Sequence, residues 1–430
     1  MIIRYNIVMG PVKKILKTVC FIALFILCAN GFRYLLIDDT ESYTRLMLHE
    51  FYAQKNIDVL FVGSSHCYGS LDPKVTDESF QMNTFNAGTA LQALDASYAL
   101  IREAADLYDV KQVYLEMYYL MMGNDDYQDR EYLTETYIVA DYMRPSLNKA
   151  RFLLEASSPK YYVNSFLPAR RNWEKLLHPS EVTDLLNRKM SPAYRNYEPV
   201  NAYRSKGYIA NQGAIKNGLL LDPAGFDRVD VSKKSEDWLR TLRDIISFCQ
   251  KKGIRLTLFS APMTLFQTAG LGNYDEYIAM IRDILRGSGF EYVDFNLCRE
   301  AYFDQSADIF VDAGHMNETG AKEFSRVFAD YFTGGIGKSE LFYDSMAEKL
   351  AAAEPRILGI SFLSSGDGMR KMKIVSSMPE GTAFEVRLIN ADGSSKVVKD
   401  NSREIFFELP QEEHGTMQIL ALGQVAEIEV

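Results

Sequence analysis

Five short strand-like runs alternate with longer amphipathic stretches over the first 330 residues, and this alternation constrains the fold more than any other feature. The runs cover residues 57–62, 81–86, 110–117, 255–261 and 290–295. Most are continuously apolar, which is typical of parallel strands covered by helices on both faces. The intervening stretches predict helices at residues 94–108, 235–252, 274–286 and 318–332. The pattern therefore predicts an α/β fold with a doubly wound, five-stranded parallel sheet.

Residues 120–234 interrupt this alternation. The segment is rich in Tyr, Arg, Asn and Pro, and helical patterns occur only around residues 129–142 and 147–156. We expect a long helical insertion at the carboxyl edge of the sheet. Two interpretations remain open for it: a lid or wall that contacts the substrate, and a packing subdomain that does not.

After about residue 345 the pattern changes to short strands separated by turn signals. The strand-like runs cover residues 356–363, 372–375, 384–389, 404–408 and 417–422. Turn sequences such as Asp392-Gly393 lie between them. Residues 346–430 are therefore expected to form a small β-sandwich, which either binds a glycan or packs on the α/β domain of residues 38–345.

The N-terminal segment has the charge pattern of a membrane anchor. Four basic residues lie within the first 17 positions, residues 19–29 carry no charge, and Arg33 follows. The apolar run approaches the ~20 residues of a spanning helix if the Arg33 side chain reaches the interface. We expect residues 1–37 to form a single-pass anchor with the rest of the chain outside the cytoplasm. A cleaved signal peptide and a buried helix are the alternatives.

The charge and composition exclude several classes of function. The net charge of −10 argues against nucleic acid as the main partner. The five cysteines contain no CxxC pair, so neither a disulfide framework nor a zinc site is indicated. No phosphate loop, nucleotide fingerprint or metal-ligand cluster occurs, and we expect no cofactor and no metal.

A carboxylate precedes a histidine by three residues in Asp312-Ala313-Gly314-His315, just before the last predicted helix. One turn of chain can bring the two side chains together. Asp312 would then accept a hydrogen bond from one ring nitrogen of His315 and leave the other nitrogen free to act as a base.

A candidate nucleophile follows the first predicted strand, in Gly63-Ser64-Ser65-His66. Glycine permits a sharp turn at the strand end, and serine becomes a nucleophile only when a base activates it. The alternative is an ordinary strand-to-helix turn with capping serines. Because reactive groups gather at the carboxyl ends of parallel strands, this motif and the Asp-His motif are expected at the same sheet edge. The His66 side chain is expected to point away from Ser65.

These residues resemble the SGNH/GDSL-type hydrolases and acyltransferases. Gly63-Ser64-Ser65 stands where that family carries Gly-Asp-Ser, and Asp312-x-x-His315-x-Asn-x-x-Gly matches its last block. The resemblance covers roughly residues 55–335 and points most to the extracytoplasmic cell-surface O-acetyltransferase and DltD-like groups of bacteria. It implies a flavodoxin-like SGNH fold, with Ser65 as nucleophile, His315 as general base and then acid, and Asp312 as the residue that orients His315.

Two blocks of the family pattern match less well. The second block implies that Gly88 donates its backbone N–H to the oxyanion hole, but a later glycine of many members is absent. The third block implies an oxyanion-hole asparagine, for which Asn124 is the candidate, although it follows the strand late. Glu116 ends the third predicted strand at the same edge, where it either contacts the substrate or pairs with an arginine of the insertion. Asn317 is expected to cap the helix after His315.

The resemblance implies serine-dependent acyl transfer or ester hydrolysis on a cell-surface polysaccharide or related polymer, through a Ser-His-Asp triad. O-acetyl transfer and O-acetyl removal remain equally open. The expected location is the cell membrane, with an extracytoplasmic catalytic domain. A membrane-bound O-acyltransferase is the expected partner. The alternative function is a non-catalytic protein that binds the polymer or assembles with such an acyltransferase.

Overall fold

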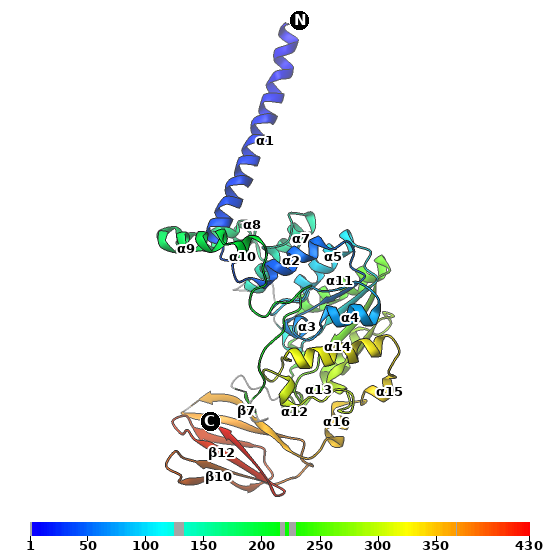
Figure 1. Ribbon diagram of the computed structural model, residues 1–430, viewed down its shortest axis with the longest axis vertical. Coiled ribbons are helices and arrows are strands. Elements are labelled where there is room, and N and C mark those ends of the chain that lie inside the picture. Colours follow the sequence, from blue (N-terminus) through cyan, green and yellow to red (C-terminus); the bar gives the residue numbers. More distant parts are fainter. Residues whose placement is uncertain (1, 124–132, 216–219, 223–228, 367) are drawn as a thin grey trace. The chain divides into compact units, whose positions relative to one another are not determined.

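The computed structural model describes residues 2–123, 133–215, 220–222, 229–366 and 368–430. By its internal contacts the chain divides into two compact units. The first joins Met1–Leu46 with Tyr127–Asn201, and the second joins Met47–Asp126 with Ala202–Val430. The first unit therefore combines the N-terminal helix with a large part of the expected insertion, whereas the described strands all belong to the second (Figure 1).

A five-stranded parallel sheet lies in the second unit. Its strands are β1 (Val59–Val62), β2 (Thr84–Asn86), β3 (Gln112–Glu116), β5 (Arg255–Ser260) and β6 (Glu291–Asp294). Their spatial order is β2-β1-β3-β5-β6, and every neighbouring pair is parallel. This is the flavodoxin-like order 2-1-3-4-5 of a doubly wound fold. The predicted α/β class and the five predicted strands are confirmed.

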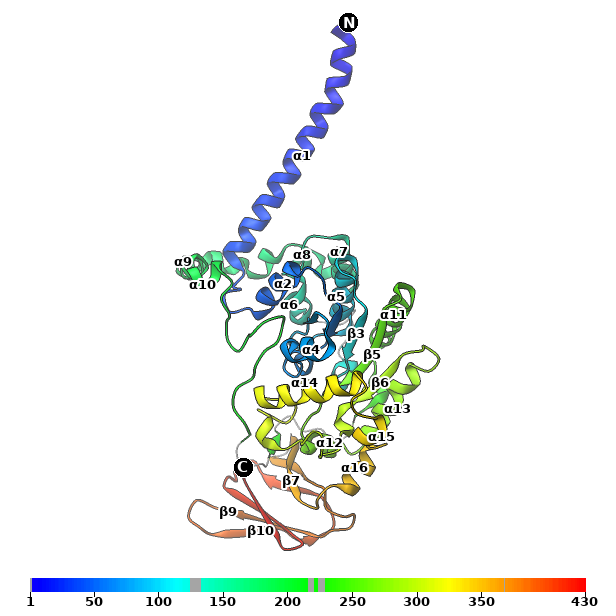
Figure 2. The same cartoon turned by 45° about the vertical axis from the view of Figure 1, so that its right-hand side comes forward.

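The four helices predicted between and after the central strands begin and end within two residues of their expected limits. They are α5 (Leu94–Leu107), α11 (Glu236–Lys252), α13 (Tyr274–Ile284) and α14 (Glu318–Phe332). The core lies between the sheet and these helices. Phe328 of α14, for example, contacts the rings of Phe61 and Phe259 on two strands, with centroid separations of 5.8 and 5.3 Å. Helix α5 packs against α11, and α14 packs against α4 (Figure 2).

Shorter elements complete the α/β part of the second unit. The α-helices are α3 (Ser65–Tyr68), α4 (Pro73–Phe80), α12 (Leu265–Gly270), α15 (Lys338–Leu341) and α16 (Met346–Ala352), together with α2 (Tyr43–Ala53), whose first four residues belong to the first unit. Single 3₁₀ turns are η1 (Tyr119–Gly123), η4 (Val231–Lys233), η5 (Phe295–Leu297) and η6 (Ala307–Ile309). Helix α3 directly follows β1, so the turn between them presents the candidate nucleophile.

The first unit is helical in its described residues. It contains α1 (Ile2–Leu36), α6 (Thr134–Ala140), α7 (Leu147–Glu155), η2 (Pro159–Tyr161), α8 (Tyr162–Phe166), η3 (Pro168–Leu177), α9 (Pro179–Met190) and α10 (Pro192–Arg195). Helix α1 is long and apolar enough to cross a membrane, and none of the most apolar 18-residue stretch within Val12–Leu36 is buried in the protein. The alternative of a buried helix is therefore wrong, whereas an anchor and a signal sequence both fit.

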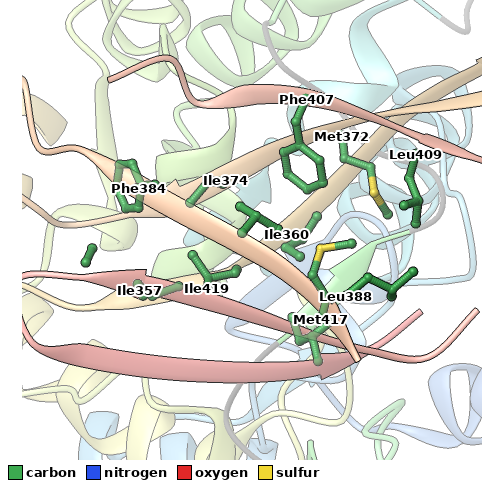
Figure 3. Close-up of a cluster of buried hydrophobic side chains, with 13 residues drawn as sticks. Ile357, Ile360, Met372, Ile374, Phe384, Leu388, Phe407, Leu409, Met417 and Ile419 are labelled. Carbon is green, nitrogen blue, oxygen red and sulfur yellow. The ribbon is translucent and has the colours of Figure 1, made fainter. Parts of the chain in front are cut away.

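The C-terminal region is a β-sandwich, as predicted. One sheet has the order β10-β9-β12-β13 and the other the order β11-β8-β7-β4. The strands are β4 (Leu220–Asp222), β7 (Ile357–Gly366), β8 (Met369–Ser376), β9 (Phe384–Ile389), β10 (Ser395–Ser402), β11 (Phe406–Pro410), β12 (Thr416–Ala421) and β13 (Gln424–Glu429). Figure 3 shows apolar side chains from both sheets meeting in one cluster.

This sandwich packs on the α/β part of the second unit through α12. Leu358 and Val375 of the sandwich form an apolar cluster with Leu265 and Phe266 of α12. Lys373 adds a hydrogen bond to a backbone carbonyl of the same helix at 2.8 Å. Packing is thus one role of this region, and glycan binding stays a prediction.

Candidate active site

The turn between β1 and α3 holds the two candidate serines in different environments. Gly63 ends the strand with φ +153°, and a Cβ added there would lie 2.5 Å from Cβ of Glu116, so only glycine fits. Ser64 caps α3, because its hydroxyl accepts a hydrogen bond from the N–H of His66 at 3.2 Å. Ser65 is the first residue of the helix. The capping role and the candidate nucleophile therefore fall on adjacent serines.

Ser65, His315 and Asp312 form a continuous hydrogen-bonded relay. Ser65 Oγ lies 2.7 Å from His315 Nε2. His315 Nδ1 lies 2.9 and 3.0 Å from the two carboxylate oxygens of Asp312. Since an ionised carboxylate only accepts hydrogen bonds, Nδ1 carries the proton and Nε2 presents a lone pair to Ser65. The structure thus brings Ser65 together with Asp312 and with His315, which lies 250 positions later in the chain.

The carboxylate of Asp312 is held in its ionised form. Partial burial opposes ionisation, but the hydrogen bond and charge of the His315 ring and the backbone N–H groups of Gly314 and His315 lower the pKa of Asp312 to about 2. Those N–H groups donate to Asp312 Oδ1 at 2.9 and 2.8 Å. Asp312 therefore orients the ring at any pH near neutrality.

Neighbouring elements fix the loop that carries this pair. The Ala313 carbonyl accepts hydrogen bonds from the N–H and the hydroxyl of Thr264, at 3.0 and 2.7 Å. Asn317 caps α14 by accepting from the N–H of Gly320 at 3.0 Å, which confirms the predicted cap. A Cβ on Gly320 would lie 2.5 Å from the Ile309 carbonyl oxygen, so this position of the motif requires glycine.

Glu116 supports the nucleophile turn from the end of β3. The residue is 5% exposed, and its Oε2 accepts hydrogen bonds from the N–H and the hydroxyl of Ser64, at 2.9 and 2.8 Å. Burial raises the pKa of Glu116 to about 7, although the Ser64 hydrogen bonds act in the opposite direction. Within the described part of the chain it forms no ion pair with an arginine of the insertion, but Arg130 lies outside the described residues, so this pairing stays a prediction. Substrate contact stays a prediction.

His66 lies in the site, and the expectation that its side chain points away is wrong. Its ring stacks on the ring of His315, with centroids 4.5 Å apart and planes 16° apart. Tyr118 contacts it as well, at 4.0 Å between centroids. Burial and the neighbouring His315 lower the pKa of His66 to about 3, so the ring is neutral. The expectation treated adjacent residues as if in a strand, but successive side chains of a helix diverge by only about 100°.

Glycine at position 314 allows this stacking. A Cβ added to Gly314 would lie 2.7 Å from Cε1 of His66. Position 314 of the Asp-x-Gly-His motif therefore requires glycine in this chain, because a side chain there would overlap the His66 ring. The sequence alone does not indicate this, since it does not show that His66 faces the loop.

Of the two predicted oxyanion-hole residues, Gly88 and Asn124, the structure describes only Gly88. Gly88 lies beside α3, since a Cβ there would be 3.0 Å from the Tyr68 backbone nitrogen. However, the Gly88 N–H donates to Asn86 Oδ1 at 3.1 Å. A role in the oxyanion hole would require this bond to break. Asn124 lies outside the described residues.

Ser65 itself offers a free backbone donor. Its N–H is at the first position of α3, where a helix leaves its N–H groups without an internal partner. No hydrogen bond of this N–H occurs among the residues that the structure describes. Across the same described ranges, no group of three or more His, Cys, Asp or Glu side chains is arranged to hold a metal ion.

Comparisons with known proteins provide little further information. No family model matches the chain, and no curated protein matches it. The chain is similar to a solved structure from Streptococcus pneumonia described as a platelet activating factor, with 12% identity and a TM-score of 0.31 over 72% of this chain and 98% of the other. It is also similar to a modular endo-β-1,4-mannanase from Cellulomonas fimi, with 10% identity and a TM-score of 0.16 over 92% and 98% of the two chains. Such low TM-scores support no inference about activity.

Proposed function

We propose that the protein is a serine-dependent acyl-transfer enzyme, acting as an esterase or an acyltransferase. The observation that carries this proposal is the 2.7 Å approach of Ser65 Oγ to His315 Nε2, with Asp312 on the opposite ring nitrogen. A nucleophile, a base and an orienting carboxylate in this order make up the triad of acyl-transfer enzymes on unrelated folds. The resemblance to SGNH-type sequences supports the same chemistry.

The reaction would proceed in two steps. Ser65 Oγ attacks the acyl carbonyl while His315 Nε2 takes its proton, and the free N–H of Ser65 donates to the oxyanion that forms. His315 then gives the proton to the leaving alcohol, which leaves an acyl ester on Ser65. In the second step, His315 removes a proton from water or from a sugar hydroxyl, which attacks the ester. That proton returns to Ser65 as the acyl group leaves.

Two buried groups would position this machinery. His66 is neutral and packs flat on the His315 ring, so it limits rotation of the base without adding a charge beside the imidazolium. Glu116 holds the Ser64 backbone and hydroxyl, and so fixes the turn from which Ser65 projects. Both act through a neighbour and not on the reacting atoms, and we assign them as positioning residues.

The substrate class follows from the sequence resemblance and the N-terminal helix. We propose an acyl ester, most simply an acetyl ester, of a cell-surface polysaccharide or related polymer, with O-acetyl transfer or removal as the reaction. Helix α1 would hold the protein in the membrane as a single-pass anchor with the catalytic unit outside the cytoplasm. A membrane-bound O-acyltransferase would then be the source of acyl groups or the assembly partner.

One observation favours the alternative of a non-catalytic binding or assembly protein. The Gly88 N–H is already engaged by Asn86, so Ser65 supplies the one free donor that we identify among the described residues near the nucleophile. Loss of one oxyanion donor typically costs ~100-fold or more in rate. A slow transferase and a polymer-binding protein differ in whether an acyl-enzyme forms.

The test is to trap that intermediate. The full-length protein in detergent is mixed with p-nitrophenyl acetate, quenched rapidly with acid, and digested for mass spectrometry. We expect acetylation of Ser65, absent in Ser65→Ala and His315→Ala. Adding neutral oligosaccharides then measures how the acyl group divides between sugar and water. Folded protein that never acetylates Ser65, yet binds the polysaccharide equally well as wild type and as Ser65→Ala, would support the binding protein instead.

A further inference from the structure

The helices of the first unit leave large apolar side chains exposed. On α8 and η3 these are Val163, Phe166, Trp173, Leu176 and Leu177, with exposed fractions between 43% and 65%. Trp173 and Leu176 are three positions apart and therefore lie on the same side of the 3₁₀-helix η3, and Leu177 follows directly. Val163 and Phe166 are three positions apart on α8 and also share a side. We call these five side chains the apolar patch. Exposed groups of this size mark interaction surfaces more often than random surface.

The patch is attached to the last turn of α1. Both η3 and α9 contact α1, and α8 contacts η3. Lys189 of α9 donates to the Tyr34 carbonyl at 2.9 Å. Arg33 donates to the carbonyl of Asp141, whose carboxylate pairs with Arg171 of η3 at 2.6 Å. In Figures 1 and 2, α8 and α9 lie at the end of α1 that is remote from the N-terminus.

That turn of α1 would lie where the helix leaves the membrane. The apolar segment Val12–Leu36 has 25 residues and spans about 37 Å at 1.5 Å per residue. The hydrocarbon core of a bilayer is ~30 Å thick. Arg33 and Tyr34 in the last turn are of the types that anchor a helix at the interface. Elements bonded to this turn therefore lie at headgroup depth when α1 spans the membrane.

The charge of the surrounding helices fits an anionic lipid surface. Residues 147–195, which run from α7 to α10, contain nine basic and four acidic side chains, a net charge of +5. The basic residues are Lys149, Arg151, Lys160, Arg170, Arg171, Lys175, Arg188, Lys189 and Arg195, and the acidic ones are Glu155, Glu174, Glu181 and Asp184. The whole chain carries −10, so this segment has the opposite sign. Basic segments beside a membrane are attracted to anionic headgroups.

We propose that the apolar patch is seated in the lipid–water interface on the side of the membrane where α1 ends. The indole of Trp173 and the side chains of Leu176 and Leu177 would enter the boundary between headgroups and acyl chains, while the basic residues contact headgroups. Interfacial helices combine these features, with Trp and Leu on one side and Lys and Arg on the other. The occupant is lipid and not a second protein, because the patch continues the membrane contact of α1 and lies in a segment of positive charge. This inference rests on α1 spanning the membrane and is independent of the acyl-transfer proposal.

The test uses the two tryptophans of the chain. The full-length protein is reconstituted alone into vesicles of phosphatidylcholine and phosphatidylglycerol that carry brominated acyl chains, which quench indoles inside the bilayer. Trp238 is 2% exposed in the core of the second unit and serves as an internal reference. The single-tryptophan variants Trp238→Phe and Trp173→Phe separate the two signals. An alkaline wash verifies that α1 is inserted.

We expect Trp173 to show blue-shifted emission and strong quenching, and Trp238 to show little quenching. Quenching of Trp173 should be strongest when the bromines lie near the headgroups. Replacing both Leu176 and Leu177 by Asp, at exposed positions, should shift Trp173 emission toward that of a hydrated indole without changing Trp238. Unquenched, red emission from Trp173 while α1 is inserted would overturn the proposal and leave a protein partner as the occupant. Failure of α1 to resist the alkaline wash would overturn it equally.

Discussion

The two edges of the central sheet differ in what they bring together. At the carboxyl edge, Ser65 contacts His315, which contacts Asp312, and the adjacent Ser64 donates to Glu116 at the end of β3, all at 2.7–3.0 Å. At the amino edge, the first residues of β1, β3, β5 and β6 line a cavity of about 610 Å³ together with aromatic side chains. That lining contains Arg255 and Glu291 but no histidine. An open space alone is therefore a poorer sign of chemistry than a set of groups joined in a relay.

The difference has a topological cause. Each parallel strand delivers the start of its following loop to the carboxyl edge, so loops from distant parts of the chain meet there. Glycines at positions 63, 314 and 320 then permit the close approaches at this edge. The amino edge receives the ends of helices and turns, and its cavity is lined largely by the first residues of strands. Substitutions at the two edges should accordingly have very different effects.

The largest difference is expected from the nucleophile. Ser65→Ala removes the attacking oxygen and should lower kcat for hydrolysis of an activated acetyl ester by roughly 10⁶-fold, as for other triads. Arg255→Gln at the amino edge is the matched control and should retain wild-type rates. Equal losses in both variants, measured as initial rates on folded protein, would contradict the comparison.

Asp312 is expected to matter next. Asp312→Asn keeps the size of the side chain but can donate to His315 Nδ1 and so favour the wrong tautomer, with a loss of roughly 10⁴-fold in kcat. Because the pKa of Asp312 is lowered to about 2, wild-type activity should show no decline from its protonation until the solution becomes strongly acidic. A variant that keeps more than about a tenth of wild-type kcat would show that the orienting role is absent.

His66 should give an intermediate effect. Removing a ring that packs on the base in His66→Ala lets His315 rotate, and a small misplacement of a catalytic group costs up to roughly 10²-fold. His66→Phe keeps the stacking surface and should recover most of kcat, with little change of KM in either variant. A rise in KM alone, or no recovery in the Phe variant, would assign His66 a different role.

Glu116, at the carboxyl edge, should make the stability of the protein depend on pH. Its folded-state pKa of about 7 exceeds the ordinary 4.5, so its contribution to stability is complete below about pH 4.5 and is lost as the pH rises through about 7. Glu116→Gln cannot ionise. Between about pH 4 and pH 9 its stability relative to wild type should increase by on the order of 3 kcal/mol. The free energies of unfolding of wild type and Glu116→Gln are measured by urea denaturation over this pH range. A constant difference between the two proteins would show that burial does not raise the pKa of Glu116.

The sequence was sufficient to predict an element wherever its pattern of apolar residues follows the burial of the strand or helix. The central strands are buried on both faces and read as continuous apolar runs, and β9 alternates between buried and half-buried positions. Strand β10 was missed because none of its residues is buried, so it carries no apolar period. Strand β4 lies inside the insertion, and its partner among the described strands is the distant β7. Pairing of this kind is decided by tertiary contact and has no local signal.

In the candidate site, too, some features were predictable from the sequence and others depend on tertiary contacts. Ser65, Asp312 and His315 were predictable because a motif and a sheet edge agree. The stacking of His66 was not, since it depends on α3 beginning at Ser65 and on the absence of a Cβ at position 314. The engagement of the Gly88 N–H by Asn86 is likewise a short-range contact that the family pattern does not indicate.

The most direct test of the relay asks whether Ser65 is an activated nucleophile. The full-length protein in detergent is treated with a fluorophosphonate, and the adduct is located by mass spectrometry in wild type, Ser65→Ala and His315→Ala. We predict a phosphonylated Ser65, an unmodified Ser64, and no adduct in either variant. Folded wild type that stays unlabelled, or labelling that persists without His315, would contradict the account.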